Sequence, residues 1–379
     1  MRIALLAADS RQVYRQYDRT TPAFGTPVAA LIDGFSRRPE IELHVVSCTQ
    51  EPMVSPGMLA RNVWFHSVPV PKWGWMRTLY WGCSAAVRRR LEVIQPDLVH
   101  GQGTERECAI TAVRSGRPGV ITVHGNMRAI ARHFRARPLS FHWLAARLEV
   151  AAIRRARGVV CLSTYGAQMA AALARRTWRV PNAVDAGLFE TVRAVSAPPL
   201  LLCVGSICRE KGQIALIEAL EPLAKAHAFR LAFHGHLIAG ENYDQEFTQL
   251  VARHAWCEFR GFADRPALAA ALAEATALLH PTLEDNCPMA VLEALAVGVP
   301  VIASRIGGLP DLIEDGRNGF LCDPQNPKTF ADAVAQLLSD PARAAAMSDV
   351  SRAEARRQFH PDVIADAHVA IYREVLGTA

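Results

Sequence analysis

Residues 280–311 constrain the fold more than any other stretch of this sequence. An apolar run ends at His280, a polar loop follows, apolar residues then recur near helical spacing, and Gly298 and Pro300 stop that pattern. A second apolar run, residues 301–303, comes next. The order of strand, loop, amphipathic helix and strand predicts parallel strands joined by a helix, which is the repeating unit of an α/β fold.

Two acidic residues bracket the start of that predicted helix. Asp285 lies in the loop and Glu293 lies eight positions later, about two helical turns away, so both could face a ligand at the helix N-terminus. That terminus presents unpaired N–H groups and the positive end of the helix dipole, and both suit a phosphate group. On spacing alone, a surface helix with ordinary acidic N-terminal residues explains the pattern equally well.

Length and composition limit the class of protein. A chain of 379 residues is long for one hydrophobic core, so we expect two domains. No run of 18 apolar residues is present to span a bilayer. The apolar residues 1–8 lead straight into Asp9 without a cleavage region, so we interpret them as a first strand rather than a signal peptide. The nine cysteines show no metal-binding spacing, so we expect buried thiols, no metal and a cytoplasmic protein.

The excess of positive over negative charge lies in the first half of the chain. Residues 1–190 hold about 26 Lys and Arg against about 13 Asp and Glu, so this half should prefer an anionic partner. Two stretches in it, residues 72–90 and 128–157, mix aromatic and basic side chains, as interfacial helices do against anionic lipid headgroups. Alternatively, their aromatic side chains face the core and their arginines face solvent. Without a recognition motif beside this charge, nucleic acid is not an expected partner.

The stretch around Asp285 and Glu293 resembles the signature of the retaining glycosyltransferases of family 4, which have the GT-B fold. That signature has two Glu residues separated by seven others, ahead of an Ala-Met-Ala-x-Gly-x-Pro-Val run. Here the run is Glu293 to Val301, Asp285 holds the first Glu position, and Glu284 lies one residue early. The resemblance implies two Rossmann-like, doubly wound α/β domains facing across a cleft, with a C-terminal helix, residues 361–376, crossing back to the first domain.

Further positions carry the resemblance through the first domain. Gly25 stands where the family usually has a Gly-Gly pair, and the strand-end motifs at His100 and at His124-Gly125-Asn126 match family motifs. The stretch from Pro181 to Phe189 matches Pro-Asn-Gly-Val-Asp-x-x-x-Phe, with Ala183 in place of Gly. The resemblance implies that His124 touches the transferred sugar and that His100, His124 and Asn126 serve acceptor binding.

The second domain begins with an apolar strand that ends at Gly205. A glycine-containing turn with Arg209 and Lys211 then opens a helix, which suits a diphosphate group. In the family an Arg usually follows the first Gly; Ser206 holds that position here, so Arg209 is expected to supply the guanidinium. We expect an acceptor-binding domain at 1–190, with 361–379 packing back on it, and a donor-binding domain at 199–360, joined by a hinge at 191–199.

The resemblance therefore implies a retaining glycosyltransferase that moves a sugar from a nucleotide-diphosphate sugar to an acceptor hydroxyl. UDP-sugar is favoured and GDP-sugar is next, the acceptor is a glycan or a lipid-linked molecule, and no cofactor or metal is expected. The catalytic positions are His124, Arg209, Lys211 and Asp285. The donor-binding positions are Gly25, Gly205, Arg209, Lys211, Phe262, Asp285, Asn286, Cys287, Pro288, Met289, Ala290 and Glu293.

Other functions stay open at this point. One is a nucleotide-sugar epimerase or a phosphorylase on the same fold. Another is a catalytically inactive scaffold that binds a membrane surface. For the enzyme we expect a role in cell-surface polysaccharide or glycolipid synthesis, in the cytoplasm, where the basic half allows a peripheral position on the inner face of the membrane.

Overall fold

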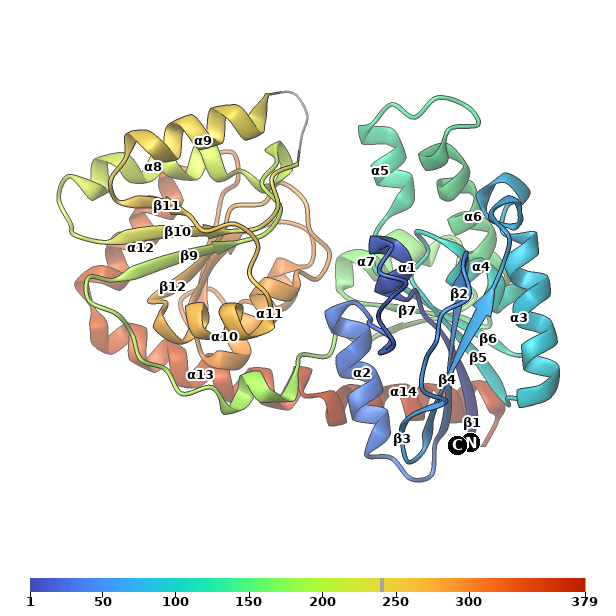
Figure 1. The fold of residues 1–379 in the computed structure, drawn as a ribbon. Coiled ribbons are helices and arrows are strands. Elements are labelled where there is room, and N and C mark those ends of the chain that lie inside the picture. Colours follow the sequence, from blue (N-terminus) through green and yellow to red (C-terminus); the bar gives the residue numbers. More distant parts are fainter. Residues whose placement is uncertain (239–241, 379) are drawn as a thin grey trace. The chain divides into compact units, whose positions relative to one another are not determined.

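The computed structural model describes residues 1–238 and 242–378 and divides the chain into two compact units. Unit 1 contains residues 1–183 together with the C-terminal residues from 360 onward, and unit 2 contains residues 184–359 (Figure 1). Each unit is an α/β structure built on one sheet. The expected α/β class is therefore confirmed.

Unit 1 has an eight-stranded sheet in the order β3-β4-β2-β1-β5-β6-β7-β8, in which only the β3–β4 pair is antiparallel. Its strands are rich in buried aliphatic residues because helices cover both faces of a parallel sheet. The strands are β1 (Arg2–Leu6), β2 (Glu42–Thr49), β3 (Met58–Ala60), β4 (Val63–Pro69), β5 (Leu98–Gln102), β6 (Gly119–Val123), β7 (Gly158–Cys161) and β8 (Thr177–Arg179). The helices are α1 (Ser10–Tyr14), α2 (Thr26–Ser36), α3 (Trp81–Ile94), α4 (Glu107–Arg114), α5 (Met127–His133), α6 (Phe141–Arg155), α7 (Thr164–Ala171) and α14 (Pro361–Leu376), with short 3-10 turns η1 (Lys72–Gly74) and η2 (Met76–Thr78).

The C-terminal helix α14 belongs to unit 1, as the resemblance implied, and it packs against α2. Phe35 of α2 stacks on Tyr372 of α14, with ring centroids 6.0 Å apart. Arg38 forms an ion pair with Asp366, with Nε and Oδ1 2.5 Å apart. An apolar stacking contact and an ion pair thus hold the chain's last helix on its first domain.

Unit 2 has a six-stranded parallel sheet in the order β11-β10-β9-β12-β13-β14. The chain winds outward from β9 in one direction and from β12 in the other, so the two strands flank the topological switch point. Ligands of open α/β sheets bind at the carboxyl ends of strands at such a point. The strands are β9 (Leu200–Val204), β10 (Arg230–His234), β11 (Cys257–Phe259), β12 (Ala277–His280), β13 (Val301–Ser304) and β14 (Gly319–Cys322). The helices are η3 (Ala186–Glu190), η4 (Arg209–Lys211), α8 (Gln213–Ala224), α9 (Tyr243–Arg253), α10 (Arg265–Glu274), α11 (Met289–Val297), η5 (Leu309–Asp311), α12 (Lys328–Ser339) and α13 (Pro341–Phe359).

Two expectations about unit 2 are wrong. The helix that follows Asp285 exists as α11, but it is not amphipathic, because every residue from 291 to 297 is buried. The segment 191–199 is not a free hinge. Arg193 donates hydrogen bonds to the carbonyl oxygens of Gly298 and Ala275, and Ala194 N–H donates to a carbonyl of α10, so the segment is anchored within unit 2.

Candidate functional site

Lys211 and Asp285 meet at the switch point of unit 2. Lys211 lies in the turn after β9 and Asp285 in the loop after β12, and the two strands are neighbours. Lys211 Nζ lies 2.5 Å from Asp285 Oδ2, and His280 Nε2 lies 3.2 Å from the same oxygen. Burial by itself raises the pKa of Asp285, but the hydrogen bond with His280 and the charge of Lys211 outweigh it and lower this pKa to about 2. Asp285 is therefore an ionised carboxylate at neutral pH.

Close backbone approaches fix this contact. Gly212, just after Lys211, has φ +67°, and a Cβ there would lie 2.2 Å from the carbonyl oxygen of Pro281. Gly307 has φ +58°, and a Cβ there would lie 1.9 Å from the carbonyl oxygen of Asp285. That same oxygen accepts a hydrogen bond from Gly308 N–H, at 3.0 Å. The Asp285 loop is therefore held between two turns in which a side chain larger than hydrogen does not fit.

The N-terminus of α11 adjoins the Asp285 loop. Pro288 is its N-cap residue and is buried with Cys287, whereas Met289 and Ala290 form the first turn. First-turn amides have no partner within the helix, so they can donate to an anion. Asn286 connects this turn to Asp285. The positive end of the α11 dipole, the first-turn amides of α11 and the Lys211 side chain therefore all lie around the Asp285 loop.

Glu293, about one turn into α11, has the opposite environment. Only 6% of it is exposed, and its burial raises its pKa to about 7. Arg265 lowers this pKa and Asp185 raises it, and these two residues pair with each other at 3.2 Å between Nη1 and Oδ2. Glu293 is thus close to half protonated at neutral pH, whereas Asp285 is not.

The remaining donor positions in unit 2 are more exposed. Arg209 is exposed, with its guanidinium 5.8 Å from the ring centroid of Tyr243. Phe262 is 64% exposed and stacks on His236, with ring centroids 4.5 Å apart. Gly205 N–H donates to the carbonyl oxygen of His234, the last residue of β10, so Gly205 lies at the carboxyl ends of β9 and β10.

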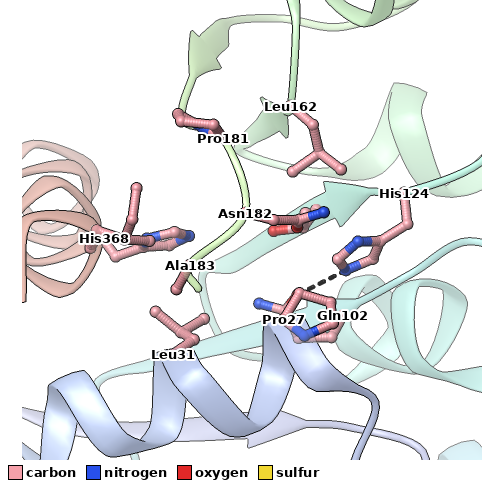
Figure 2. Close-up of a pocket in the computed structure, with 11 residues that line it drawn as sticks. Pro27, Leu31, Gln102, His124, Leu162, Pro181, Asn182, Ala183 and His368 are labelled. Atoms are coloured by element: carbon pink, nitrogen blue, oxygen red, sulfur yellow. Dashed lines mark hydrogen bonds between the residues drawn. The ribbon is translucent and has the colours of Figure 1, made fainter. Parts of the chain in front are cut away.

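In unit 1, His124 lines a small pocket at the carboxyl end of the sheet (Figure 2). His124 Nε2 lies 3.0 Å from Gln102 Oε1, the contact drawn as a dashed line in Figure 2. Burial lowers the pKa of His124, against the opposing effect of Glu105, so the ring is neutral at pH 7. The lining residues are Pro27, Leu31, Gln102, Thr122, His124, Leu162, Pro181, Asn182, Ala183, Ile364 and His368.

The other two acceptor positions in unit 1, His100 and Asn126, and the donor position Gly25 have local structural roles. His100 is fully buried, with Nδ1 2.7 Å from the hydroxyl of Tyr372 and Nε2 2.8 Å from that of Thr122, so it cannot contact an acceptor in this structure. Asn126 caps α5, where its side chain accepts from Ala129 N–H. Gly25 is the N-cap residue of α2, and a Cβ there would touch nothing closer than 3.9 Å.

Several residues at these sites were missed in the sequence. His280 is the polar end of an otherwise apolar strand, a signal that could have singled it out as a partner of Asp285. Gln102 gives a similar signal at the end of β5. Glu105 and Glu149 bind backbone N–H groups of the His124 loop, and they give no such signal because these partners are distant in sequence. Within residues 1–238 and 242–378, no group of three or more His, Cys, Asp or Glu side chains could hold a metal ion.

The comparisons with known proteins agree with this architecture. Residues 26–188 match the family model Glycosyltransferase Family 4, and residues 198–340 match the model Glycosyl transferases group 1. A glycogen synthase of Mycobacterium tuberculosis is 31% identical over 199 residues, which cover 51% of this chain and 47% of that protein. The chain therefore spans about half the length of the curated relatives it matches first.

Solved structures share the fold of the whole chain. Sucrose-phosphate synthase from Thermosynechococcus elongatus matches with a TM-score of 0.76 at 19% identity and covers 100% of both chains. HepE from Anabaena, solved in complex with UDP-glucose, matches with a TM-score of 0.71 at 19% identity and also covers 100% of both. The fold is therefore GT-B, as expected. With both family models matching, the chain belongs to the family 4, or group 1, glycosyltransferases.

Proposed function

We propose that this protein transfers a sugar, with retention of configuration and without a metal, from a nucleotide-diphosphate sugar to an acceptor hydroxyl. The observation that carries the proposal is the contact between Lys211 and Asp285 at the switch point of unit 2, beside the N-terminus of α11. A cation and first-turn amides can stabilise the charge that grows on a leaving diphosphate. The solved complex of HepE with UDP-glucose supports UDP as the favoured nucleotide. GDP stays our second choice.

Each side chain has a role in this proposal. Lys211 and Arg209 neutralise the diphosphate. Among the described residues, the hydrogen bonds to the Asp285 carboxylate both go to Oδ2, so Oδ1 can accept from sugar hydroxyls. Glu293 accepts from the two ribose hydroxyls. Phe262 and Gly205 flank the base, and His124 contacts the transferred sugar in unit 1. The bond between the anomeric carbon and the phosphate oxygen breaks, and the acceptor oxygen bonds to that carbon on the same face. The leaving phosphate oxygen takes the proton of the acceptor hydroxyl.

A titration tests the donor site. UDP-glucose and a GDP-sugar are titrated by calorimetry, without added metal, against wild type, Glu293→Ala, Glu293→Gln and the control Glu218→Ala. Glu218 is an exposed residue of α8. We expect binding of one nucleotide sugar, a loss of about tenfold or more in both Glu293 variants, and no change in the control. If wild type binds no nucleotide sugar, the protein is not a transferase of this kind and the inactive scaffold gains support.

Product release separates transfer from the other enzymatic candidates. A transferase releases the nucleoside diphosphate faster when an acceptor is present. An epimerase converts the donor without releasing its nucleotide, and a phosphorylase requires inorganic phosphate. Following the diphosphate by coupled assay, with and without a glycan acceptor, decides among the three.

We also propose that unit 1 binds an anionic membrane surface, because both basic aromatic stretches expose large apolar side chains. Around the α5–α6 connection, Phe134 is 60% and Leu139 76% exposed, among exposed arginines. In the other stretch, Trp73 is 65% and Trp81 56% exposed, whereas its other aromatic side chains are buried in the core. No helix of the described residues is long and apolar enough to cross a membrane. Salt-sensitive sedimentation with phosphatidylglycerol vesicles, reduced in Phe134→Ser, would support surface binding.

A further inference from the structure

Glu149 binds the loop that carries His124. It lies on α6, is 1% exposed, and comes more than twenty residues after the loop it contacts. Its Oε2 accepts from Met127 N–H at 3.0 Å and from the hydroxyl of Thr104 at 2.8 Å. Met127 immediately follows the His124-Gly125-Asn126 loop, and Thr104 lies in the neighbouring loop after β5. One buried oxygen therefore joins three separate segments of unit 1.

Its second oxygen binds the next residue of the same segment. Oε1 of Glu149 lies 3.3 Å from Arg128 Nε and 3.4 Å from Arg128 N. The far end of this guanidinium donates to the carbonyl oxygen of Met169, at 2.6 Å. All these partners are donors, so the site requires an ionised carboxylate.

A second carboxylate holds the loop from its other side. Glu105 Oε1 accepts from Gly125 N–H at 2.7 Å. The amides of Gly125 and Met127, on either side of Asn126, are thus bound by two carboxylates from two different elements. His124, the residue before Gly125, cannot shift without disturbing that pair of contacts.

Capping of α5 explains only part of this arrangement. Asn126 accepts from Ala129 N–H, and Glu149 accepts from the N–H groups of Met127 and Arg128, the first two residues of α5. Burying a carboxylate is unfavourable, and burial raises the pKa of Glu149 although the bonds from Met127, Thr104 and Arg128 oppose the shift. The contacts of Glu149 with Thr104 and of Glu105 with Gly125 lie outside α5, so they do not serve its capping. These long-range contacts fix where the loop lies relative to α6 and to the loop after β5.

We propose that Glu149 is a positioning residue which, together with Glu105, holds His124 in place for the sugar-transfer step. This inference rests on the proposed function, in which His124 contacts the transferred sugar. Glu149 itself touches no substrate. Its loss should therefore act on turnover and on the mobility of the loop, and should spare most of the nucleotide-sugar affinity, because we assign the contacts to the base, the ribose and the diphosphate to unit 2.

Glu149→Gln, Glu149→Ala and Glu105→Gln test this, with Glu92→Gln as the matched control on the exposed face of α3. Three quantities are measured: affinity for the nucleotide sugar that wild type binds, kcat and KM for transfer, and hydrogen exchange of the peptide covering residues 124–131. We expect affinity within about twofold of wild type, kcat lower by about tenfold or more in Glu149→Gln and further in Glu149→Ala, and faster exchange in the peptide. Glu92→Gln should match wild type in all three.

Other outcomes overturn the inference. Unchanged kcat and unchanged exchange in both Glu149 variants and in Glu105→Gln would show that the contacts position nothing. A loss of nucleotide-sugar affinity and melting temperature in proportion to kcat would make Glu149 a structural residue only. If wild type itself shows no turnover, the proposed function fails, and hydrogen exchange still decides whether Glu149 and Glu105 hold the loop.

Discussion

The loop after β6 in unit 1 and the loop after β12 in unit 2 occupy the same kind of place, at the carboxyl end of a parallel sheet, but their charges are arranged in opposite ways. In unit 2 a loop carboxylate, Asp285, meets the cation of Lys211. In unit 1 the loop side chain is a neutral imidazole, His124, and carboxylates of Glu105 and Glu149 bind the loop amides. One architecture thus provides a cation–carboxylate pair, which we propose for the diphosphate and the sugar, and a neutral imidazole, which we propose for the sugar hydroxyls.

The largest effect should come from removing the cation of unit 2. Lys211→Met takes away the charge nearest Asp285 and the leaving diphosphate, so we expect kcat to fall about 10²–10³-fold. The control is Lys225→Met, because the Lys225 side chain is 75% exposed and, within the described residues, forms an ion pair with Glu221 on the surface of α8. Steady-state release of nucleoside diphosphate measures both. A kcat within about threefold of wild type in Lys211→Met would remove the proposed electrostatic difference between the two loops.

A second test compares a glycine packed against the loop after β12 in unit 2 with a glycine at a helix start in unit 1. Gly212→Ala in unit 2 places a Cβ 2.2 Å from the Pro281 carbonyl oxygen at φ +67°, so we expect unfolding free energy to fall by about 2–4 kcal/mol. Gly25→Ala in unit 1 meets no atom closer than 3.9 Å and should lower it by less than about 1 kcal/mol. Urea unfolding of both variants measures the difference. Equal losses of unfolding free energy in the two variants would show that the close approach of Gly212 to Pro281 does not determine the cost of a side chain there.

A smaller, pH-dependent effect should distinguish the two acids of unit 2. Glu293 has a folded pKa of about 7, raised by burial from its ordinary value of 4.5. Ribose binding requires the carboxylate, so nucleotide-sugar affinity should be about tenfold weaker at pH 6 than at pH 8. Glu293→Gln should abolish this dependence. Asp285, whose pKa is lowered to about 2, stays ionised throughout that range.

Protein stability should change in the other direction over the same range. The pKa of Glu293 is higher in the folded state than in the unfolded state, so its protonated form stabilises the fold. This contribution to the free energy of unfolding is fully present below pH 4.5 and is lost as the pH rises through 7. Its size is on the order of 3 kcal/mol. Urea unfolding of wild type and Glu293→Gln between pH 5 and 8 measures it. A difference between them that does not vary with pH would show that Glu293 titrates at its ordinary value.

Local patterns predicted much of this protein. Helix α14 lies at residues 361–376, as expected, and α11 stops before Gly298, since apolar periodicity and a glycine stop signal act within a few residues. The same patterns described α11 as amphipathic, because periodicity does not reveal what covers a helix's second face. They also described segment 191–199 as a hinge, because nothing in its composition shows that Arg193 binds carbonyl oxygens far along the chain.

By itself, the sequence determined the order of strands and helices, the glycine-containing turns and the acidic pair at positions 285 and 293. The tertiary structure alone decided which of these residues meet. Lys211 reaches Asp285 because β9 and β12 are neighbours in the sheet, and Glu149 reaches Met127 because α6 packs beside α5. The charge state of Glu293 was likewise decided by burial, which depends on everything packed around α11. Periodicity is a local property of the chain, whereas contacts and burial depend on how distant segments pack together.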